Sequence, residues 1–379
     1  MLWVAWKMLI GNRVKYLGIV FGVMFAALLI AQQSSIFCGL MLLTVSQIRD
    51  VQGPDIWVMD KHVQFVDDVK PLADTELFRV KGVPGVAWAV RFYKGSGRAR
   101  LEEGTYEQMM LIGLDDATLV GAPEGVFLGS IADLRKPDAV IMDEAGYRRC
   151  WPGEPVRLGR IFEMNDRRAV LVGITKASRT FQSFPIVYTR YSQAVLFSPP
   201  ERKVLSFVLA EAEEGLDPEE VCRRIETQAG LQAVTKKQFV WKTIRYYLAK
   251  TGIPVNFAIT VLLGFIVGTA IAGQTFYLFT VENIRQFGAL KAMGTSNWTI
   301  LLMVLSQAVQ VGVVGYGVGV GLAALFGYCA TSGLTRLSFF MPWQVLVLTA
   351  AAVFVIVLLA SLLSIRKVLV VDPAIVFRG

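Results

Sequence analysis

The sequence has little of what most enzymes and ion-coupled transporters require. It contains a single histidine, His62, and four cysteines among 379 residues, which excludes metal sites built on paired histidines. No G-x-x-x-x-G-K-S/T or G-x-S-x-G motif occurs, so the chain shows neither a P-loop for ATP nor the nucleophile elbow of a hydrolase. We therefore predict no catalytic residue and no metal site, and we expect His62 at the surface.

Charge is also absent from four long stretches of the chain. A bilayer core about 30 Å thick needs about 20 apolar helical residues, and four segments exceed that length: 17–43, 254–281, 299–328 and 342–365. The first is longer than the apolar core of a cleaved secretory signal, which has about 7–15 residues, so we interpret it as an uncleaved anchor. No ionisable residue interrupts these spans, so no intramembrane proton relay is predicted.

Basic residues flank the spans unevenly, and this asymmetry predicts their orientation. Lysine and arginine occur in residues 1–16, in the loop 282–298 and in the tail 366–379, whereas the loop between the third and fourth spans has only Arg336. The positive-inside rule then places both termini and the 282–298 loop in the cytoplasm, and residues 44–250 on the other side. Most of the net charge of +8 lies in these short segments, so it indicates topology and not nucleic-acid binding.

Small residues recur every four positions on the third span. Such rows allow helix backbones to approach closely inside a membrane. The row is predicted to serve helix packing, and packing within one chain or between two subunits both remain open. Its members are Gly315, Gly319, Ala323 and Gly327.

The segment 44–250 has the composition of an ordinary soluble domain. The predicted fold class is thus an α-helical membrane protein with four transmembrane helices and a large α+β extracytoplasmic domain inserted between helices 1 and 2. Residues 50–97 and 199–236 each show a strand–helix–strand order, so the two ends of the domain are predicted to form one α+β subdomain. The stretch 98–198 is interpreted as a β-rich insertion. Its predicted strands are Met109–Ile112, Ala139–Met142, Val156–Leu158, Ala169–Ile174 and Pro185–Thr189.

Two helices of this domain have recognisable start signals. Asp74 is a candidate N-cap for a helix over about residues 72–80. Asp217, followed by proline and two acids, starts a second helix that ends at Gly230.

Two features of the domain leave alternatives open. Residues 237–250 mix aromatic side chains and cations at helical spacing, which fits either a belt at the membrane surface or a stalk that continues the second span outward. Cys150 and Cys222 could form one disulfide. The sequence leaves this open, because it does not show whether the two residues are close enough to be bridged.

The cytoplasmic loop 282–298 is predicted to form a short helix up to Gly294. Apolar residues recur in it at steps of three, which predicts an exposed apolar edge flanked by two cations. Such an edge fits either a helix on the lipid surface or a docking helix for a soluble motor protein. The apolar residues are Ile284, Phe287, Leu290 and Met293, and the cations are Arg285 and Lys291.

Several segments resemble the FtsX/MacB-like permeases of ABC transporters. The run RQFGALKAMG, residues 285–294, is similar to their Arg-Glu-Ile-Gly-x-x-(Arg/Lys)-Ala-Leu-Gly loop, with Gln286 and Phe287 in place of Glu and Ile. The tail DPAIVFR from Asp372 is similar to their terminal Asp-Pro-Ala-x-x-Leu-Arg, and the N-terminal AWKMLIGNR also fits. The order of one span, a large external domain and three spans matches the family, and the heterocyst-exporter DevC branch shows a further resemblance.

The resemblance implies a permease that is not itself an enzyme, with ATP and Mg²⁺ bound by a separate ABC ATPase subunit. It implies a homodimer or paired permease in the lipid of the bacterial inner membrane, with a periplasmic membrane-fusion adaptor and an outer-membrane channel as further partners. The implied activity is export or extraction of a substrate by motion relayed to the periplasmic domain. The alternative is a signalling permease that regulates a periplasmic partner such as a cell-wall hydrolase. The implied ATPase-coupling residues are Ile284, Arg285, Gln286, Phe287, Gly288, Leu290, Lys291, Met293 and Gly294.

Overall fold

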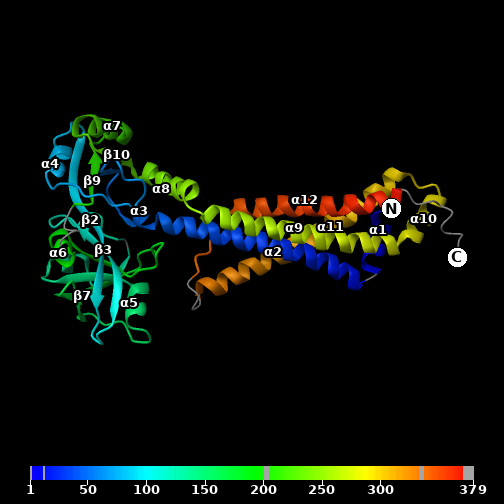
Figure 1. The fold of residues 1–379 in the computed structure, drawn as a ribbon, viewed down its shortest axis with the longest axis horizontal. Helices are drawn as coiled ribbons and strands as arrows, with labels where there is room; N and C mark the ends of the chain where they lie inside the picture. The colour runs from blue at the N-terminus through cyan, green and yellow to red at the C-terminus, as the bar shows by residue number, and fades with distance from the viewer. Residues whose placement is uncertain (1, 12, 124, 200–204, 333–336, 370–379) are drawn as a thin grey trace. The chain divides into compact units, whose positions relative to one another are not determined.

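The chain forms two compact units, Met1–Leu40 with Gly252–Gly379, and Met41–Thr251. We call the first the helical unit and the second the α+β domain, and Figure 1 labels many of their elements. The structure is a computed structural model, and it describes residues 2–11, 13–123, 125–199, 205–332 and 337–369. The tail motif that begins at Asp372 lies outside the described residues.

The helical unit is built from long apolar helices. Four of them, α2, α9, α11 and α12, are long and apolar enough to cross a membrane, and the α+β domain is inserted between the first two, which confirms the predicted fold class. The bounds are α1 Leu2–Gly11, α2 Arg13–Thr44, α9 Ile253–Glu282, α10 Ile284–Ala292, α11 Asn297–Ser332 and α12 Trp343–Leu369.

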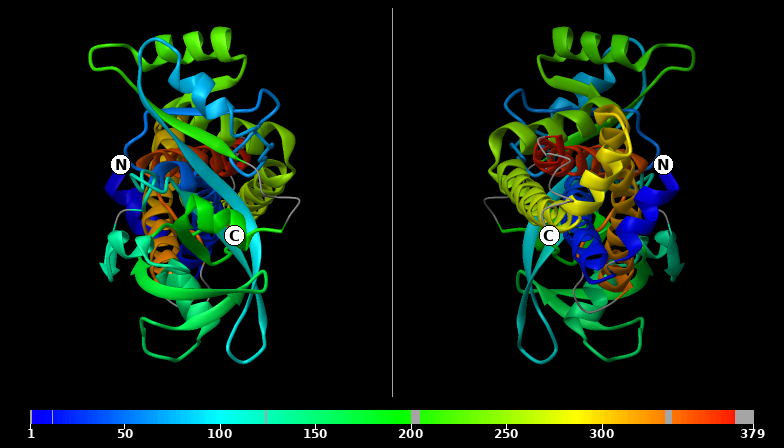
Figure 2. Two further views of the ribbon diagram at one scale, coloured as in Figure 1. Left: turned by 90° about the vertical axis from the view of Figure 1, so that its left-hand side faces the viewer. Right: turned by 90° about the vertical axis from the view of Figure 1, so that its right-hand side faces the viewer.

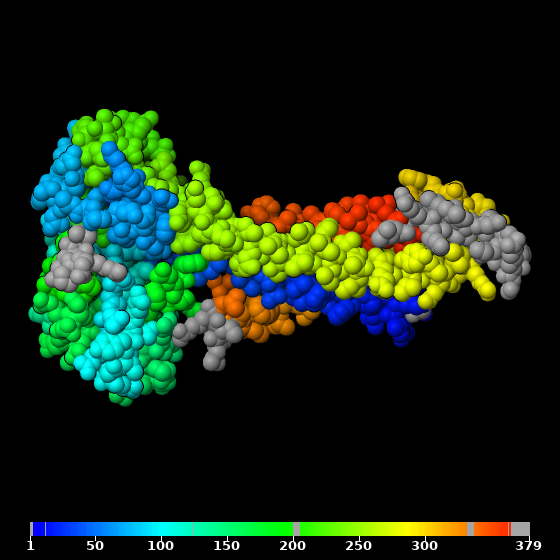
Figure 3. Space-filling model, viewed as in Figure 1, coloured from blue at the N-terminus to red at the C-terminus, as the bar shows by residue number. Residues whose placement is uncertain are grey.

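The surface of the helical unit suits lipid. Val255, Ile259 and Leu262 of α9 are exposed, and this helix, in yellow-green, is open to view along its length in Figure 3. Exposed aromatic residues stand at helix ends, with Trp298 at the start of α11 and Trp343 at the start of α12. Aromatic side chains at such positions are typical of the two membrane–water interfaces.

Glycines bring α11 against α2. A Cβ added to Gly315 would lie 2.7 Å from Val23 Cγ1, and one added to Gly319 would lie 2.7 Å from Ala27 Cβ. Both distances are far below ordinary van der Waals contact, so only glycine permits this approach.

The rest of the small-residue row also packs within the chain. Ala323 is fully buried, and a Cβ on Gly327 would collide with the ring of Phe339, which precedes α12. These four positions therefore face neighbours in the same chain.

The α+β domain contains short helices and ten named strands among its described residues. The strands are β1 Ile56–Met59, β2 Val86–Arg100, β3 Tyr106–Leu114, β4 Val126–Leu128, β5 Ala139–Asp143, β6 Ile161–Met164, β7 Arg167–Thr175, β8 Ile186–Arg190, β9 Phe207–Ala212 and β10 Gln232–Thr235. The helices are α3 Ser46–Asp50, α4 Glu76–Lys81, η1 Ile131–Arg135, α5 Glu144–Cys150, α6 Tyr191–Phe197, α7 Pro218–Ala229 and α8 Lys236–Lys250.

One part of the domain is an open antiparallel sheet of order β10-β1-β9-β2. This is the strand order of a split βαβ unit, in which each half supplies two strands and a helix. Helices cover both faces of the sheet. On one face, Ile56 belongs to the hydrophobic cluster that contains Val80 of α4 and Ile225 of α7. On the opposite face, Trp57 belongs to the cluster that contains Phe239 of α8.

The other part is a closed barrel. Strand pairing runs β2-β3-β8-β5-β7-β6 and returns from β6 to β2. The strand β2 belongs to both parts, because residues up to Phe92 pair with β9 and residues from Tyr93 onward pair with β3. Figure 2 shows β2 in cyan as one long twisted strand.

Three details of the domain differ from the sequence-based expectations. The helix α4 begins at Glu76 and not at 72, and Asp74 accepts a hydrogen bond from the Tyr191 hydroxyl (2.9 Å) instead of capping it. The predicted strand Val156–Leu158 is irregular backbone.

The reason for the missing strand is a side chain that takes the place of a strand partner. The Tyr147 hydroxyl donates to the Pro155 carbonyl oxygen (2.9 Å) and accepts from the Arg157 N–H (3.1 Å). Cys150 and Cys222 are both buried and free, so they form no disulfide.

Candidate functional site

The candidate site is α10, the short helix between the spans α9 and α11. Only Asn283 separates α9 from α10, and its backbone N–H (3.2 Å) and side-chain amide (2.7 Å) both donate to the Phe279 carbonyl oxygen. The Asn283 carbonyl oxygen in turn accepts from Gln286 and Phe287. Hydrogen bonding thus continues through the junction, so α10 is joined to α9 by a bend and not by a loop.

The far end of α10 is closed by a Schellman motif. Gly294 has φ +89°, a left-handed conformation that favours glycine. Its N–H donates to the Lys291 carbonyl oxygen (2.9 Å), and the Thr295 N–H donates to the Leu290 carbonyl oxygen (3.1 Å). The Ser296 hydroxyl then accepts from the Thr299 N–H (3.2 Å) at the start of α11. The turn between the two helices is therefore short and held by hydrogen bonds at both ends.

The predicted exposed apolar edge of this helix is wrong. Phe287 is fully buried and Leu290 is 7% exposed, and both belong to the core cluster of the helical unit. That cluster also contains Phe279 of α9 and Met303 of α11. The spacing of three correctly marks an apolar face, but this face turns towards the membrane helices, which the spacing alone cannot reveal.

The outward surface of α10 is mostly polar. Arg285, Gln286 and Gly294 are exposed, and Met293 is the large apolar side chain among them, with 74% of its surface open. Ile284 and Lys291 are half-buried, and Gly288 is buried. The sequence-predicted set thus divides into an anchoring face, with Phe287, and an exposed face, with Arg285, Gln286 and Met293.

The junction carries two further features that sequence reasoning missed. Glu282, the last residue of α9, forms an ion pair with Lys15 near the start of α2. Asn283 forms the hydrogen-bonded bend described above. The available signal was the charged residue Glu282 at the end of an apolar span, followed by asparagine. This signal does not identify the partner of Glu282, because Lys15 on α2 is more than 260 positions away in the sequence.

A second candidate is a cleft of about 520 Å³ in the α+β domain, lined by β2, β3 and three loop segments that contain Asp67, Gln182 and Ser206. Lys94 lies in it with 4% of its surface exposed, donates to the Val66 carbonyl oxygen (2.8 Å) and forms an ion pair with Asp67. Burial lowers the pKa of Lys94, and the neighbouring Asp67 carboxylate opposes that shift. Across the described ranges, no group of three or more His, Cys, Asp or Glu side chains is placed to hold a metal ion.

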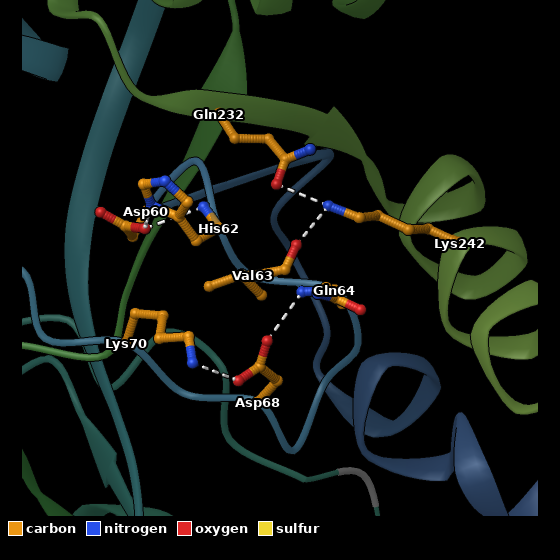
Figure 4. Close-up of polar contacts among 8 residues, drawn as sticks. All are labelled: Asp60, His62, Val63, Gln64, Asp68, Lys70, Gln232 and Lys242. Atoms are coloured by element: carbon orange, nitrogen blue, oxygen red, sulfur yellow. Dashed lines mark hydrogen bonds and ion pairs between the residues drawn. The ribbon is translucent and has the colours of Figure 1, made fainter. Parts of the chain in front are cut away.

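The loop that forms one side of this cleft is attached to α8. Lys242 of α8 donates to the Val63 carbonyl oxygen and to Gln232 Oε1 (both 2.5 Å), as Figure 4 shows. Phe65 stacks on Tyr246 of α8 with ring centroids 4.1 Å apart. The loop around residues 60–70 and α8 are therefore one packed structure.

The chain is similar to known membrane proteins over most of its length. Residues 255–373 match the family model described as FtsX-like permease C-terminal. An uncharacterized ABC transporter permease of Mycobacterium tuberculosis is 27% identical over 338 residues, which cover 87% of this chain and 86% of the relative. One of Mycobacterium bovis is 26% identical over 313 residues, covering 82% and 80%.

Two solved structures match the α+β domain with TM-scores of 0.36. The extracellular domain of the ABC-type transporter YknZ from Gram-positive bacteria is 16% identical, and the match covers 48% of this chain and 98% of that one. The periplasmic region of MacB from Actinobacillus actinomycetemcomitans is 13% identical, with coverage of 54% and 96%.

Proposed function

We propose, from the premise that this chain belongs to the FtsX-like permeases of ABC transporters, that it relays ATP-driven motion of a separate ATPase subunit to its α+β domain. In this proposal α10 docks on the ATPase in the cytoplasm, and the α+β domain lies on the other side of the inner membrane. The motion serves export or extraction of a substrate, together with a periplasmic adaptor. The uneven distribution of basic residues around the spans supports this orientation.

The observation that carries the proposal is the way α10 is built into the helical unit. The buried Phe287 anchors it among the membrane helices, Asn283 joins it to α9 without a loop, and Gly294 fixes its turn into α11. A force applied to the exposed face of α10 therefore reaches both spans, because no flexible segment lies between to absorb it.

The connections into the α+β domain support the second half of the relay. The spans α2 and α9 are continuous in sequence with α3 and α8, the first and last helices of that domain. Within the domain, Lys236 at the start of α8 donates to the carbonyl oxygens of Arg49 (3.2 Å) and Val51 (2.6 Å) at the end of α3. A displacement that arrives through either connection is thus shared by both.

The test is Met293→Asp, measured in nanodiscs with the purified ATPase. Burying a methionine side chain contributes about 1.5–3 kcal/mol, so the affinity for the ATPase should fall by about tenfold or more, together with stimulated ATP hydrolysis. The matched control is Phe78→Asp on α4, which replaces another exposed apolar residue and should leave both quantities unchanged.

Two results would contradict the proposal. One is an unchanged affinity and hydrolysis rate for Met293→Asp. The other is labelling of residues in the α+β domain by an impermeant reagent supplied from the cytoplasmic side, which would invert the topology.

A further inference from the structure

The helix α8 presents an exposed face on which cations and large apolar side chains alternate. Trp241 is 67% exposed and Leu248 44%, and Lys237 and Arg245 are exposed on the same side. Steps of four, four and three residues place these four side chains in one stripe along the helix. The helix contains no aspartate or glutamate, so nothing on it neutralises the two cations.

The opposite face of α8 is fully engaged. Phe239 is buried with its ring centroid 5.4 Å from that of Trp57 in β1, and Thr243 and Tyr247 are buried as well. Lys242, beside this face, holds the loop around Val63 (Figure 4). Rotation of α8 would break these contacts, so the stripe cannot turn inward to hide its tryptophan.

The position of α8 in the chain limits what can cover the stripe. The helix ends at Lys250 and the span α9 begins at Ile253, so the two connecting residues extend over no more than about 10 Å. The C-terminal end of α8 therefore lies within about 10 Å of the first residue of the candidate span α9. Because 15 helical residues are about 22 Å long, the orientation of α8 decides whether its other end touches lipid.

We propose that the stripe of Lys237, Trp241, Arg245 and Leu248 rests on the membrane and binds the headgroups of anionic phospholipids. Exposed tryptophan beside lysine and arginine suits the headgroup region, where the ring enters the interface and the cations meet phosphate. A second copy of the chain fits less well, because paired α8 helices would bring these cations together without an acid between them. The proposal concerns a different surface from α10 and does not depend on coupling to an ATPase.

The alternative is an upright α8 that extends the span away from the bilayer. In that arrangement position 241 stands about 14 Å farther from the membrane than Lys250, at about 1.5 Å per residue, and its side chain meets water. The two orientations therefore predict different surroundings for one side chain.

The experiment places a nitroxide label on Trp241→Cys in the full chain, in nanodiscs with and without phosphatidylglycerol. The background carries Cys38→Ser and Cys329→Ser, since the two remaining cysteines are buried. The matched control is Phe78→Cys on α4, which replaces an aromatic residue that is 64% exposed. The label at 241 should show lipid contact, by oxygen accessibility, and more of it with phosphatidylglycerol, while the label at 78 should remain in water.

A second set of variants tests the cations. Lys237→Gln and Arg245→Gln should each lower the ratio of lipid-bound to free α8 by about fivefold in phosphatidylglycerol membranes, whereas Arg223→Gln, at an exposed cation of α7, should not. Three outcomes would overturn the proposal: a label at 241 as hydrated as that at 78, spin–spin coupling between labels of two copies, or lipid contact that does not respond to the two cations.

Discussion

The contact between α11 and α2 permits a sharp test, because α11 carries two kinds of glycine. We expect Gly319→Ala to destabilise the helical unit and Gly321→Ala, on the same helix, not to. A Cβ on Gly319 would lie 2.5 Å from the Met24 carbonyl oxygen and 2.7 Å from Ala27 Cβ, whereas one on Gly321 would meet nothing within 4 Å. Ordinary contact is about 3.5–4.0 Å, so α2 and α11 must separate by about 1 Å to admit the first methyl group.

The size of the effect follows from the difference between the two variants. Both gain about 1 kcal/mol of helix propensity relative to glycine, and this gain cancels in the comparison. Overpacking costs about 1–3 kcal/mol, and that penalty applies to Gly319 alone. For a unit of this size each kcal/mol changes the melting temperature by about 2–4 °C.

The assay is thermal unfolding of the full chain in detergent micelles, followed by tryptophan fluorescence. Gly319→Ala should melt several degrees below Gly321→Ala. Equal melting temperatures would refute the close approach of α11 and α2. A lower melting temperature for Gly321→Ala would indicate that Gly321, and not Gly319, lies against a neighbouring helix.

Three further results are expected. Phe287→Ala removes the buried anchor of α10, so it should destabilise the helical unit by about 3 kcal/mol and abolish stimulated ATP hydrolysis while ATPase binding persists; loss of binding with unchanged stability would contradict the anchoring role. Gly294→Ala forces an alanine to φ +89°, at a penalty of about 1–2 kcal/mol, and should speed hydrogen exchange in α10; unchanged exchange would contradict the Schellman motif. Burial raises the pKa values of Cys150 and Cys222 to about 12, so a maleimide at pH 8 should label neither until the domain is unfolded, and rapid labelling of the folded domain would disprove their burial.

Much of the fold could be predicted because its strongest signals are local. A run of about 20 apolar residues without charge rarely forms anything but a membrane span. In the α+β domain, Asp217 caps α7 and Gly230 ends it with φ +68°, as their residue types indicate, because capping depends on neighbours only a few positions away.

What could not be predicted depends on distant partners. The strand β2 runs on through Lys94, Gly95, Ser96 and Gly97, which break the alternation expected of a strand; their pairing with β3 shapes this segment. The burial of Phe287 is a case of the same kind, since the helices that cover it come from other parts of the sequence.

The shared strand β2 has a mechanical consequence. Because its first half is paired in the open sheet and its second half in the barrel, no linker separates these two bodies. The barrel therefore cannot rotate independently of the sheet, and any tilt of the sheet tilts the barrel with it.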